Sequence, residues 1–204
     1  MNYAQDEILR IMQWLLPQLA ADEILAVELA YKDVRRKADV AILSPSRLTA
    51  IEVKGPRDNL QKLHPQISDY LQGFQEVYVA AATRFIPQLS KEMPRQVGII
   101  ELASDAVKHR RKATRRACLP KDGAIHWLQT RDLQRLLGPA SKGKAIEHLR
   151  EHAVANLSSV QLSNAALKSV FDRAKARYDI FRSELGERLT HDDIETLQLP
   201  TKIR

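Results

Sequence analysis

Two short apolar segments joined by a turn constrain the fold of this chain more than any other part of its sequence. Residues 38–43 and 48–53 are rich in β-branched and aliphatic side chains, which favour strands. The four residues between them, Ser-Pro-Ser-Arg, are of the types that form tight turns. The sequence therefore predicts two adjacent strands paired as a hairpin.

Charged residues stand at corresponding ends of these two strands. Side chains alternate between the two faces of a strand, so Glu52 and Lys54 point to the same side of the second strand. Asp39, on the first strand, points to the same side as Glu52 and Lys54 under one condition. The apolar residues that share a strand face with Asp39 must pack in the same layer as those that share a strand face with Glu52. The pattern thus predicts that three charged groups meet beside the sheet.

Such a group has the composition of a metal-dependent phosphodiesterase centre. Neighbouring carboxylates repel each other unless a cation lies between them, and Mg²⁺ commonly takes one or two protein carboxylates together with waters. Asp39 and Glu52 fit Mg²⁺, with Mn²⁺ as a possible substitute. Lys54 could orient a metal-activated water or offset charge on the phosphate. The alternative is that these residues are solvated charges at an exposed strand end.

An amphipathic helix is expected after the second strand. Gly55-Pro56-Arg57-Asp58 is a cluster of chain-breaking residues, and Asp58 could cap a helix that begins near Asn59. Apolar residues then recur at three- and four-residue spacing from Leu60 to Phe74, which marks a buried stripe. Pro65 should kink this helix or break it just before the next residue.

The combined pattern resembles the PD-(D/E)XK nuclease superfamily, in particular the small stand-alone bacterial members of its RecB-like branch. Its elements in this chain are Asp39, Glu52-Val53-Lys54 and Gln66-x-x-x-Tyr70. The resemblance implies that Asp39 and Glu52, with Val53 beside them, form the metal site and that Lys54 assists catalysis. It further implies that Gln66 and Tyr70 shape the site or contact DNA. The residue before Asp39 is Ala38, where the superfamily pattern has Pro.

A third carboxylate lies upstream, in a segment whose structure is ambiguous from the sequence. Residues 24–31 alternate imperfectly and fit either a strand or a helix. Glu28 lies within this segment, and several members of the superfamily carry an additional acidic residue ahead of the Asp. Glu28 is therefore either a third metal ligand or a solvated strand glutamate.

Basic residues gather in one later segment. Residues 108–116 read KHRRKATRR, and the formal net charge of the chain is +7. A loop or edge strand of this composition could bind the phosphate backbone of DNA, or it could be a solvated basic surface. The candidate contacts are Lys108, Arg110, Arg111, Lys112, Arg115 and Arg116. Arg35 and Arg36, in the connector 32–37, are either further phosphate contacts or part of a plain solvated turn.

The remaining pattern predicts an α/β core followed by helices. An amphipathic helix is expected over 6–19, and buried strands over 76–82 and 96–102, whose spacing suits a right-handed parallel connection. The predicted fold is a restriction-endonuclease-like mixed sheet flanked by helices. We expect residues 1–122 to form this core, and residues 123–204 to form a helical region that packs on it or mediates a homodimer.

The function predicted from the sequence is hydrolysis of phosphodiester bonds by a Mg²⁺-dependent nuclease. DNA is the favoured substrate, and RNA is the less favoured one. The alternatives are a nucleic-acid-binding or regulatory module that does not cleave, and a defence or repair component that needs a partner protein. Cys118 is the only cysteine, which excludes an internal disulfide. With neither a cleavage signal nor an apolar run of about 20 residues, we expect a cytoplasmic protein without membrane spans.

Overall fold

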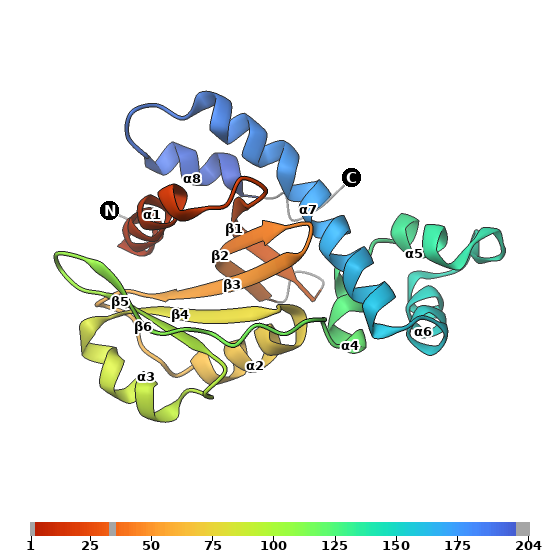
Figure 1. Cartoon of the computed structure of the whole chain (residues 1–204), viewed down its shortest axis with the longest axis horizontal. Coiled ribbons are helices and arrows are strands. Elements are labelled where there is room, and N and C mark those ends of the chain that lie inside the picture. Colours follow the sequence, from red (N-terminus) through yellow and green to blue (C-terminus); the bar gives the residue numbers. More distant parts are fainter. Residues whose placement is uncertain (1–2, 33–35, 199–204) are drawn as a thin grey trace.

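The computed structural model describes residues 3–32 and 36–198, and a mixed six-stranded sheet lies at its centre (Figure 1). The strands are β1 (Ile24–Tyr31), β2 (Arg36–Ser44), β3 (Arg47–Lys54), β4 (Glu76–Ala82), β5 (Gly98–Leu102) and β6 (Val107–Arg111). They lie side by side in sequence order. Strands β3, β4 and β5 are parallel, and the other neighbours are antiparallel. The mixed α/β architecture expected from the sequence is therefore confirmed.

Helices cover both faces of this sheet. The α-helices are α1 (Tyr3–Leu15), α2 (Leu63–Gly73), α3 (Ile86–Glu92), α4 (Lys121–Ala124), α5 (Thr130–Leu137), α6 (Ile146–Asn156), α7 (Ser159–Glu184) and α8 (His191–Leu197). Short 3₁₀ turns occupy Leu16–Gln18, Thr83–Phe85, Ile125–Trp127 and Pro139–Ser141. Helices α1 and α8 lie on one face, and α2 and α3 lie on the other (Figure 1). Within the described ranges, no helix has the length and apolar character needed to cross a membrane.

The predicted hairpin is confirmed, and the ambiguous segment before it is a strand. Residues of β2 and β3 pair from Val40 opposite Ile51 to Ser44 opposite Arg47. Residues 24–31 form β1, which pairs antiparallel with β2. Strands β4 and β5 are parallel, as predicted, and α3 lies in the connection between them.

The start of α2 differs from the sequence prediction. The helix begins at Leu63 instead of near Asn59, because the Asp58 carboxylate accepts a hydrogen bond from the Gly55 N–H (2.7 Å) and closes the preceding turn. Pro65 consequently lies in the first turn of the helix, where its missing N–H would have no helical partner anyway. Helix α2 runs without interruption from Leu63 to Gly73, so the predicted break just before Gln66 is wrong.

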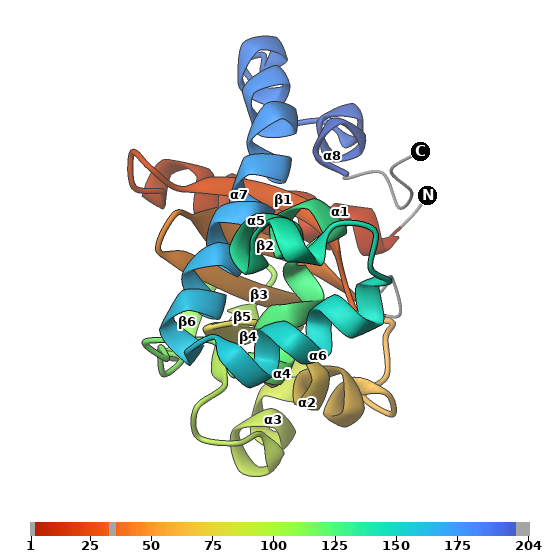
Figure 2. The ribbon, with the colours of Figure 1, turned by 90° about the vertical axis from the view of Figure 1, so that its right-hand side faces the viewer.

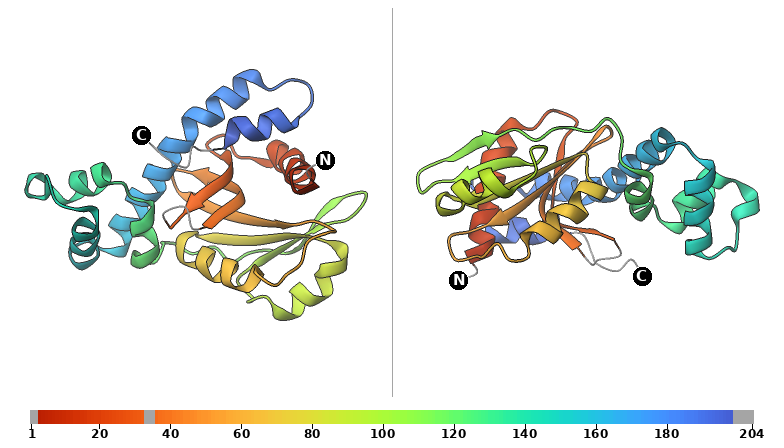
Figure 3. Two further views of the ribbon diagram at one scale, coloured as in Figure 1. Left: turned by 180° about the vertical axis from the view of Figure 1, so that it is seen from behind. Right: turned by 90° about the horizontal axis from the view of Figure 1, so that it is seen from below.

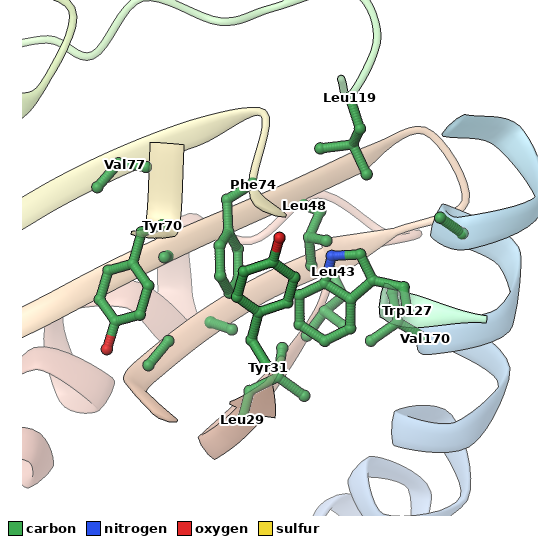
Figure 4. Close-up of a cluster of buried hydrophobic side chains, with 14 of the residues drawn as sticks. Leu29, Tyr31, Leu43, Leu48, Tyr70, Phe74, Val77, Leu119, Trp127 and Val170 are labelled. Atoms are coloured by element: carbon green, nitrogen blue, oxygen red, sulfur yellow. The ribbon is translucent and has the colours of Figure 1, made fainter. Parts of the chain in front are cut away.

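An aromatic cluster joins the sheet to the C-terminal helices (Figure 4). The ring of Phe74 lies 5.3 Å from that of Trp127 and 5.8 Å from that of Tyr31, measured between centroids. The Trp127 indole N–H donates to the Gly73 carbonyl at 2.6 Å, so its polar atom is satisfied inside the core. This contact fixes the segment before α5 to the C-terminal end of α2.

The C-terminal helices divide into a part that covers the sheet and a part that stands away from it. Helix α7 lies against β1 and β2, and buries Leu167, Val170 and Ala174 in the core. Its predicted apolar stripe therefore packs within the chain, while dimerisation through these helices stays a prediction. Helices α5 and α6 project beyond the sheet (Figures 1 and 3), and they lie in front of it when the molecule is viewed from that end (Figure 2). The predicted boundary after residue 122 falls inside α4.

Replacing Gly123 with Ala is expected to lower the free energy of unfolding by about 3 kcal/mol, because an added methyl group would overlap backbone. A Cβ at this position would lie 1.6 Å from the Gln72 carbonyl oxygen. Gly186→Ala is the matched control, since the space around Gly186 is open. Urea unfolding of both variants tests this, and equal midpoints would contradict the close packing of α4 on α2.

Candidate active site

The candidate site lies where the pairing of β2 with β3 ends. The last pair in this direction is Val40 opposite Ile51, so Asp39 and Glu52 face each other one position beyond the ladder. The Asp39 carboxylate accepts a hydrogen bond from the Val53 N–H at 2.7 Å. A side chain thus replaces the strand-to-strand backbone bond, and this fixes the Asp39 carboxylate beside the second strand.

Glu52 is the buried acid at the centre of the site. Only 2% of the residue is exposed, so an ionised carboxylate at this position requires polar partners. Its Oε1 lies 2.6 Å from the Lys54 ammonium, and its Oε2 lies 2.9 Å from the Tyr70 hydroxyl. Both oxygens of Glu52 are therefore satisfied by residues that the sequence pattern had selected.

The predicted common face of the three charged residues is confirmed. The residues in phase with Asp39 on β2, Ala41 and Leu43, are buried in the same cluster as Leu48 and Ala50. The other phase of both strands packs on the opposite face of the sheet. Because β2 and β3 keep this register, the three charged side chains meet beneath α2.

Tyr70 links the hydrophobic core to the site. Its ring is fully buried and lies 5.5 Å from the Phe74 ring, while its hydroxyl points away from Phe74 (Figure 4). The hydroxyl also lies within hydrogen-bonding distance of the Lys37 carbonyl. Burial, and then the charges of Glu52 and Asp39, raise the pKa of Tyr70, so it remains a neutral donor. Its one proton serves either Glu52 or the carbonyl at a given moment.

Asp39 and Glu52 lie close together, and nearby cations do not fully balance their negative charges. Burial, and then the charge of Glu52, raise the pKa of Asp39 to about 7. The Val53 N–H and the Lys54 ammonium lower it by less. A further cation near Asp39 would therefore stabilise its ionised form.

Gln66 contributes an unsatisfied polar atom. Its Oε1 is buried and has no hydrogen-bond partner in the described part of the chain. Leaving a buried acceptor without a donor costs about 1–3 kcal/mol, so such atoms call for a specific reason. Because Gln66 and Tyr70 lie one helical turn apart on α2, this acceptor is compatible with a ligand group at the same site.

Glu28 lies opposite Asp39 but is turned toward another partner. The pairs Val27–Val40 and Leu29–Ala38 flank the two acids on β1 and β2. Glu28 adopts a φ of 49°, which is unusual for a residue with a side chain. Its carboxylate pairs with the Lys37 ammonium at 2.9 Å. The structure therefore places Glu28 next to the site without directing its carboxylate to Asp39 and Glu52.

The donor set fits a magnesium ion held by two protein carboxylates. Within residues 3–32 and 36–198, no group of three or more His, Cys, Asp or Glu side chains forms a metal site. Mg²⁺ usually retains several waters and needs one or two carboxylates. Asp39 and Glu52 meet this requirement, whereas a third protein carboxylate has no support in this arrangement.

Two arginines of the predicted basic cluster, Arg110 and Arg111, contact polar groups of the same chain. Strand β6 forms one edge of the sheet. The Arg110 guanidinium pairs with the buried Glu101, with Nε 2.5 Å from Oε2. The Arg111 guanidinium donates to the Val97 carbonyl at 2.8 Å and to carbonyls before β5. These two residues therefore hold the β5–β6 pair in place.

The end of the cluster lies away from the candidate site. Arg115 donates to a carbonyl of the β2–β3 turn at 2.6 Å, and Arg116 donates to a carbonyl of α2 at 2.7 Å. Both contacts are near the start of β4, whereas Lys54 aligns with the end of that strand. Lys108 and Lys112 are exposed. Phosphate binding by the cluster stays a prediction, with these two lysines as its most available members.

Asp69, an acid that the sequence pattern did not single out, pairs with a cation just after β1 and with another at the start of β2. The Asp69 carboxylate contacts the Lys32 ammonium at 2.8 Å and the Arg36 guanidinium at 2.6 Å. The one indication in the sequence that Asp69 lies near the site is that it directly precedes Tyr70. Arg36 is thus tied to α2, and Arg35 lies outside the described residues.

Replacing Tyr70 with Phe is expected to lower any metal-dependent activity of the site by about 10-fold, because Glu52 loses the donor that orients it. The ring packing in the core is retained. Tyr78→Phe is the matched control, since Tyr78 packs on the opposite face of the sheet. Steady-state rates of both variants test this, and an equal effect of the two substitutions would contradict an orienting role.

Comparison with known proteins places the chain in a phage family. The family model described as bacteriophage P4 protein cII matches residues 6–198. Protein cII of Enterobacteria phage P4 is 28% identical over 102 residues, which is 50% of this chain and 38% of the phage protein. In structure, the chain is similar to the SPO1766 protein of unknown function from Silicibacter pomeroyi. That match has a TM-score of 0.47 and 20% identity, and it covers 72% of this chain and 97% of the other. The family match spans nearly the whole chain, so the protein belongs to the bacteriophage P4 protein cII family.

Proposed function

We propose that this protein is a metal-dependent nuclease of the PD-(D/E)XK type that hydrolyses phosphodiester bonds in DNA. The observation that carries the proposal is the meeting of Asp39, Glu52, Lys54 and Tyr70 from two strands and one helix. The restriction-endonuclease-like identity of the fold belongs to the same proposal, and the mixed sheet with α2 packed over it supports that identity.

The chain supplies groups suited to each task in this reaction. Asp39 and Glu52 would hold Mg²⁺ or Mn²⁺, beside the backbone of Val53. When bound, the ion would supply positive charge that polarises a phosphoryl oxygen and promotes ionisation of water. The Lys54 ammonium has three donors, so its contact with Glu52 leaves two for water or phosphate. Tyr70 keeps Glu52 oriented.

The positions of the neutral groups suit substrate binding. Gln66 lies on the same helix as Tyr70, and its buried Oε1 needs a donor that the described residues do not supply. A donor on the substrate or an ordered water would satisfy this atom. Gln66 would therefore contact the bound nucleic acid or its hydration, while the two acids and Lys54 act on the phosphate.

The second candidate function is a nucleic-acid-binding or regulatory module that does not cleave, or that cleaves only with a partner protein. The position of Glu28 favours it, because the third carboxylate pairs with Lys37 instead of joining the other acids. The contact of Lys54 with Glu52 also partly neutralises the acidic pair without any metal.

A cleavage assay separates the two candidates. The purified chain is incubated with linear, nicked, branched and single-stranded DNA, and with RNA, in Mg²⁺, Mn²⁺ or EDTA. The nuclease proposal predicts products with at least one DNA substrate in Mg²⁺ or Mn²⁺ and none in EDTA. Salt-sensitive binding to the same substrates, without products in either metal, would instead support the non-cleaving module.

A further inference from the structure

Three cations line a concave surface in the projecting helical region. A pocket of about 350 Å³ is lined by Arg131, Gln134, Arg135, Gly138, Pro139 and Lys142. All three cationic residues are exposed. No acidic residue is part of this lining. The surface is therefore an electropositive depression that is open to solvent, in contrast to the largely engaged arginines of residues 110–116.

Local backbone geometry brings the three cations together. Arg131 and Arg135 are four residues apart on α5, so they lie on one face of the helix. Gly138 then adopts a φ of +82°, which a residue without Cβ accommodates readily. The chain turns through the 3₁₀ segment Pro139–Ser141 and returns Lys142 to the pocket that the two arginines line.

These charges are not neutralised within the described chain. The side chains of Arg131, Arg135 and Lys142 form no hydrogen bond or ion pair with residues that the structure describes. Asp132, the acid of α5, accepts from the Gln129 N–H at 3.0 Å and from the Ser169 hydroxyl at 2.6 Å. Like charges at this spacing on a helix repel by a few tenths of a kcal/mol, and an anion would relieve that repulsion.

The pocket lies away from the candidate active site. The segment before α5 is anchored at the C-terminal end of α2, through the bond from Trp127 to Gly73. That end precedes β4, whereas Lys54 aligns with the last residues of β4. Helices α5 and α6 extend beyond the sheet on this side (Figures 1 and 3). A long polyanion could contact the projecting region without entering the catalytic site.

We propose that the pocket of Arg131, Arg135 and Lys142 binds the phosphate backbone of a nucleic acid. The guanidinium groups offer several donors for each phosphate, and the lysine adds a point charge. Backbone contacts of this kind are independent of sequence and weaken steeply with salt. The inference adds a second contact for the nucleic acid of the proposed function, and it requires binding without requiring cleavage.

The test measures affinity in EDTA, where the proposed cleavage cannot occur. Binding of a fluorescent 30-base-pair DNA duplex is followed by anisotropy at several KCl concentrations. The triple variant Arg131→Gln, Arg135→Gln, Lys142→Gln should raise Kd by about 10-fold or more and flatten the salt slope by about 2 to 3. The residues are exposed, and circular dichroism verifies that the helices are intact.

A matched triple variant separates the pocket from net charge. Lys91→Gln, Lys168→Gln and Lys175→Gln remove the same total charge at exposed positions, and two of these lysines already pair with Asp172 or Asp179. This control should change Kd by less than about 2-fold. Equal weakening by both triples, or an unchanged Kd and salt slope for the pocket triple, would overturn the inference.

The cleavage and binding measurements together distinguish failure of the proposed function from failure of this inference. If the wild-type chain cleaves nothing but the pocket triple still loses affinity selectively, the binding inference stands and the nuclease proposal fails. If the chain cleaves DNA in Mg²⁺ and the pocket triple binds like wild type in EDTA, the nuclease proposal stands and this inference fails.

Discussion

Replacing Glu52 with Gln is expected to lower the rate of metal-dependent DNA cleavage by about 10³-fold or more, while the fold is preserved. The amide has the shape of the carboxylate and can still accept from Tyr70. It cannot provide the negative charge that would hold the metal or attract the Lys54 ammonium, which lies 2.6 Å from Glu52. Single-turnover rates in Mg²⁺ with a cleaved linear substrate give the comparison.

Glu76→Gln is the matched control for this experiment. Glu76 is also buried and paired, with its Oε2 2.8 Å from the Arg47 guanidinium, but it lies at the other end of the parallel strands. This variant should cleave at nearly the wild-type rate once its folding is verified. If the Glu52→Gln variant kept wild-type activity, Glu52 would have no role in cleavage and the proposed mechanism would be wrong.

Replacing Asp39 with Asn is expected to stabilise the metal-free protein above pH 7 by about 2 kcal/mol or more, while cleavage is lost. Burial, and then the charge of Glu52, raise the pKa of Asp39 from 3.8 to about 7. Between these values the folded state binds more protons than the unfolded state, so wild-type stability falls as pH rises. The amide of the Asp39→Asn variant does not titrate, and the difference should vanish near pH 4.

Urea unfolding in EDTA at pH 4.5, 6 and 8 measures this effect. Asp69→Asn serves as the control of opposite sign. Burial acts to raise the pKa of Asp69, but hydrogen bonds and charges from Lys32 and Arg36 lower it overall. Its ionised form is therefore stabilising above pH 4, and its loss should destabilise the protein at pH 8. A lower stability of the Asp39 variant than of wild type at pH 8 would refute the raised pKa of Asp39 that burial and the charge of Glu52 together produce.

Adding Mg²⁺ should reverse the order of stability of wild type and the Asp39→Asn variant. A ligand that binds only the folded state stabilises it in proportion to the logarithm of its concentration over Kd. Wild type has both acids, so it should gain stability at pH 8 as Mg²⁺ rises, while the variant should gain much less. This opposition between stability and function is expected wherever like charges are held together for a ligand.

The core of the candidate site was accessible from the sequence because period-two alternation fixes which side chains share a face. Asp39, Glu52 and Lys54 could be placed together once the apolar residues of both strands were assigned to one layer, and the structure confirms that layer. The helical spacing of Gln66 and Tyr70 likewise placed both residues on one side of α2. The shared faces follow from short-range periodicity, whereas the choice of Gln66 and Tyr70 as site residues came from the resemblance to the nuclease superfamily.

Features that depend on competing hydrogen bonds were not accessible in this way. Asp58 was predicted to cap a helix, but in the structure its carboxylate bonds to Gly55, and α2 starts later. The positive φ of Glu28 and its ion pair with Lys37 are likewise features that the alternation of side chains along a strand does not predict.

The sequence was also insufficient to predict which cationic side chains are available to bind a ligand. A run of basic residues indicates charge in the sequence, but it does not tell which guanidinium groups donate to carbonyls of the same chain. Arg111 and Arg116 do so in the structure. The pocket on α5 was missed because Lys142 reaches the two arginines only through the turn at Gly138. The Arg131–Arg135 spacing was the available signal.

Anomalous diffraction from a crystal grown with Mn²⁺ tests the central claim most directly. The proposal predicts a manganese peak bound by carboxylate oxygens of both Asp39 and Glu52, and no peak at this place in crystals of Glu52→Gln. A fully ordered site with Mn²⁺ bound elsewhere, or with Asp39 and Glu52 turned away from each other and no peak between them, would contradict it.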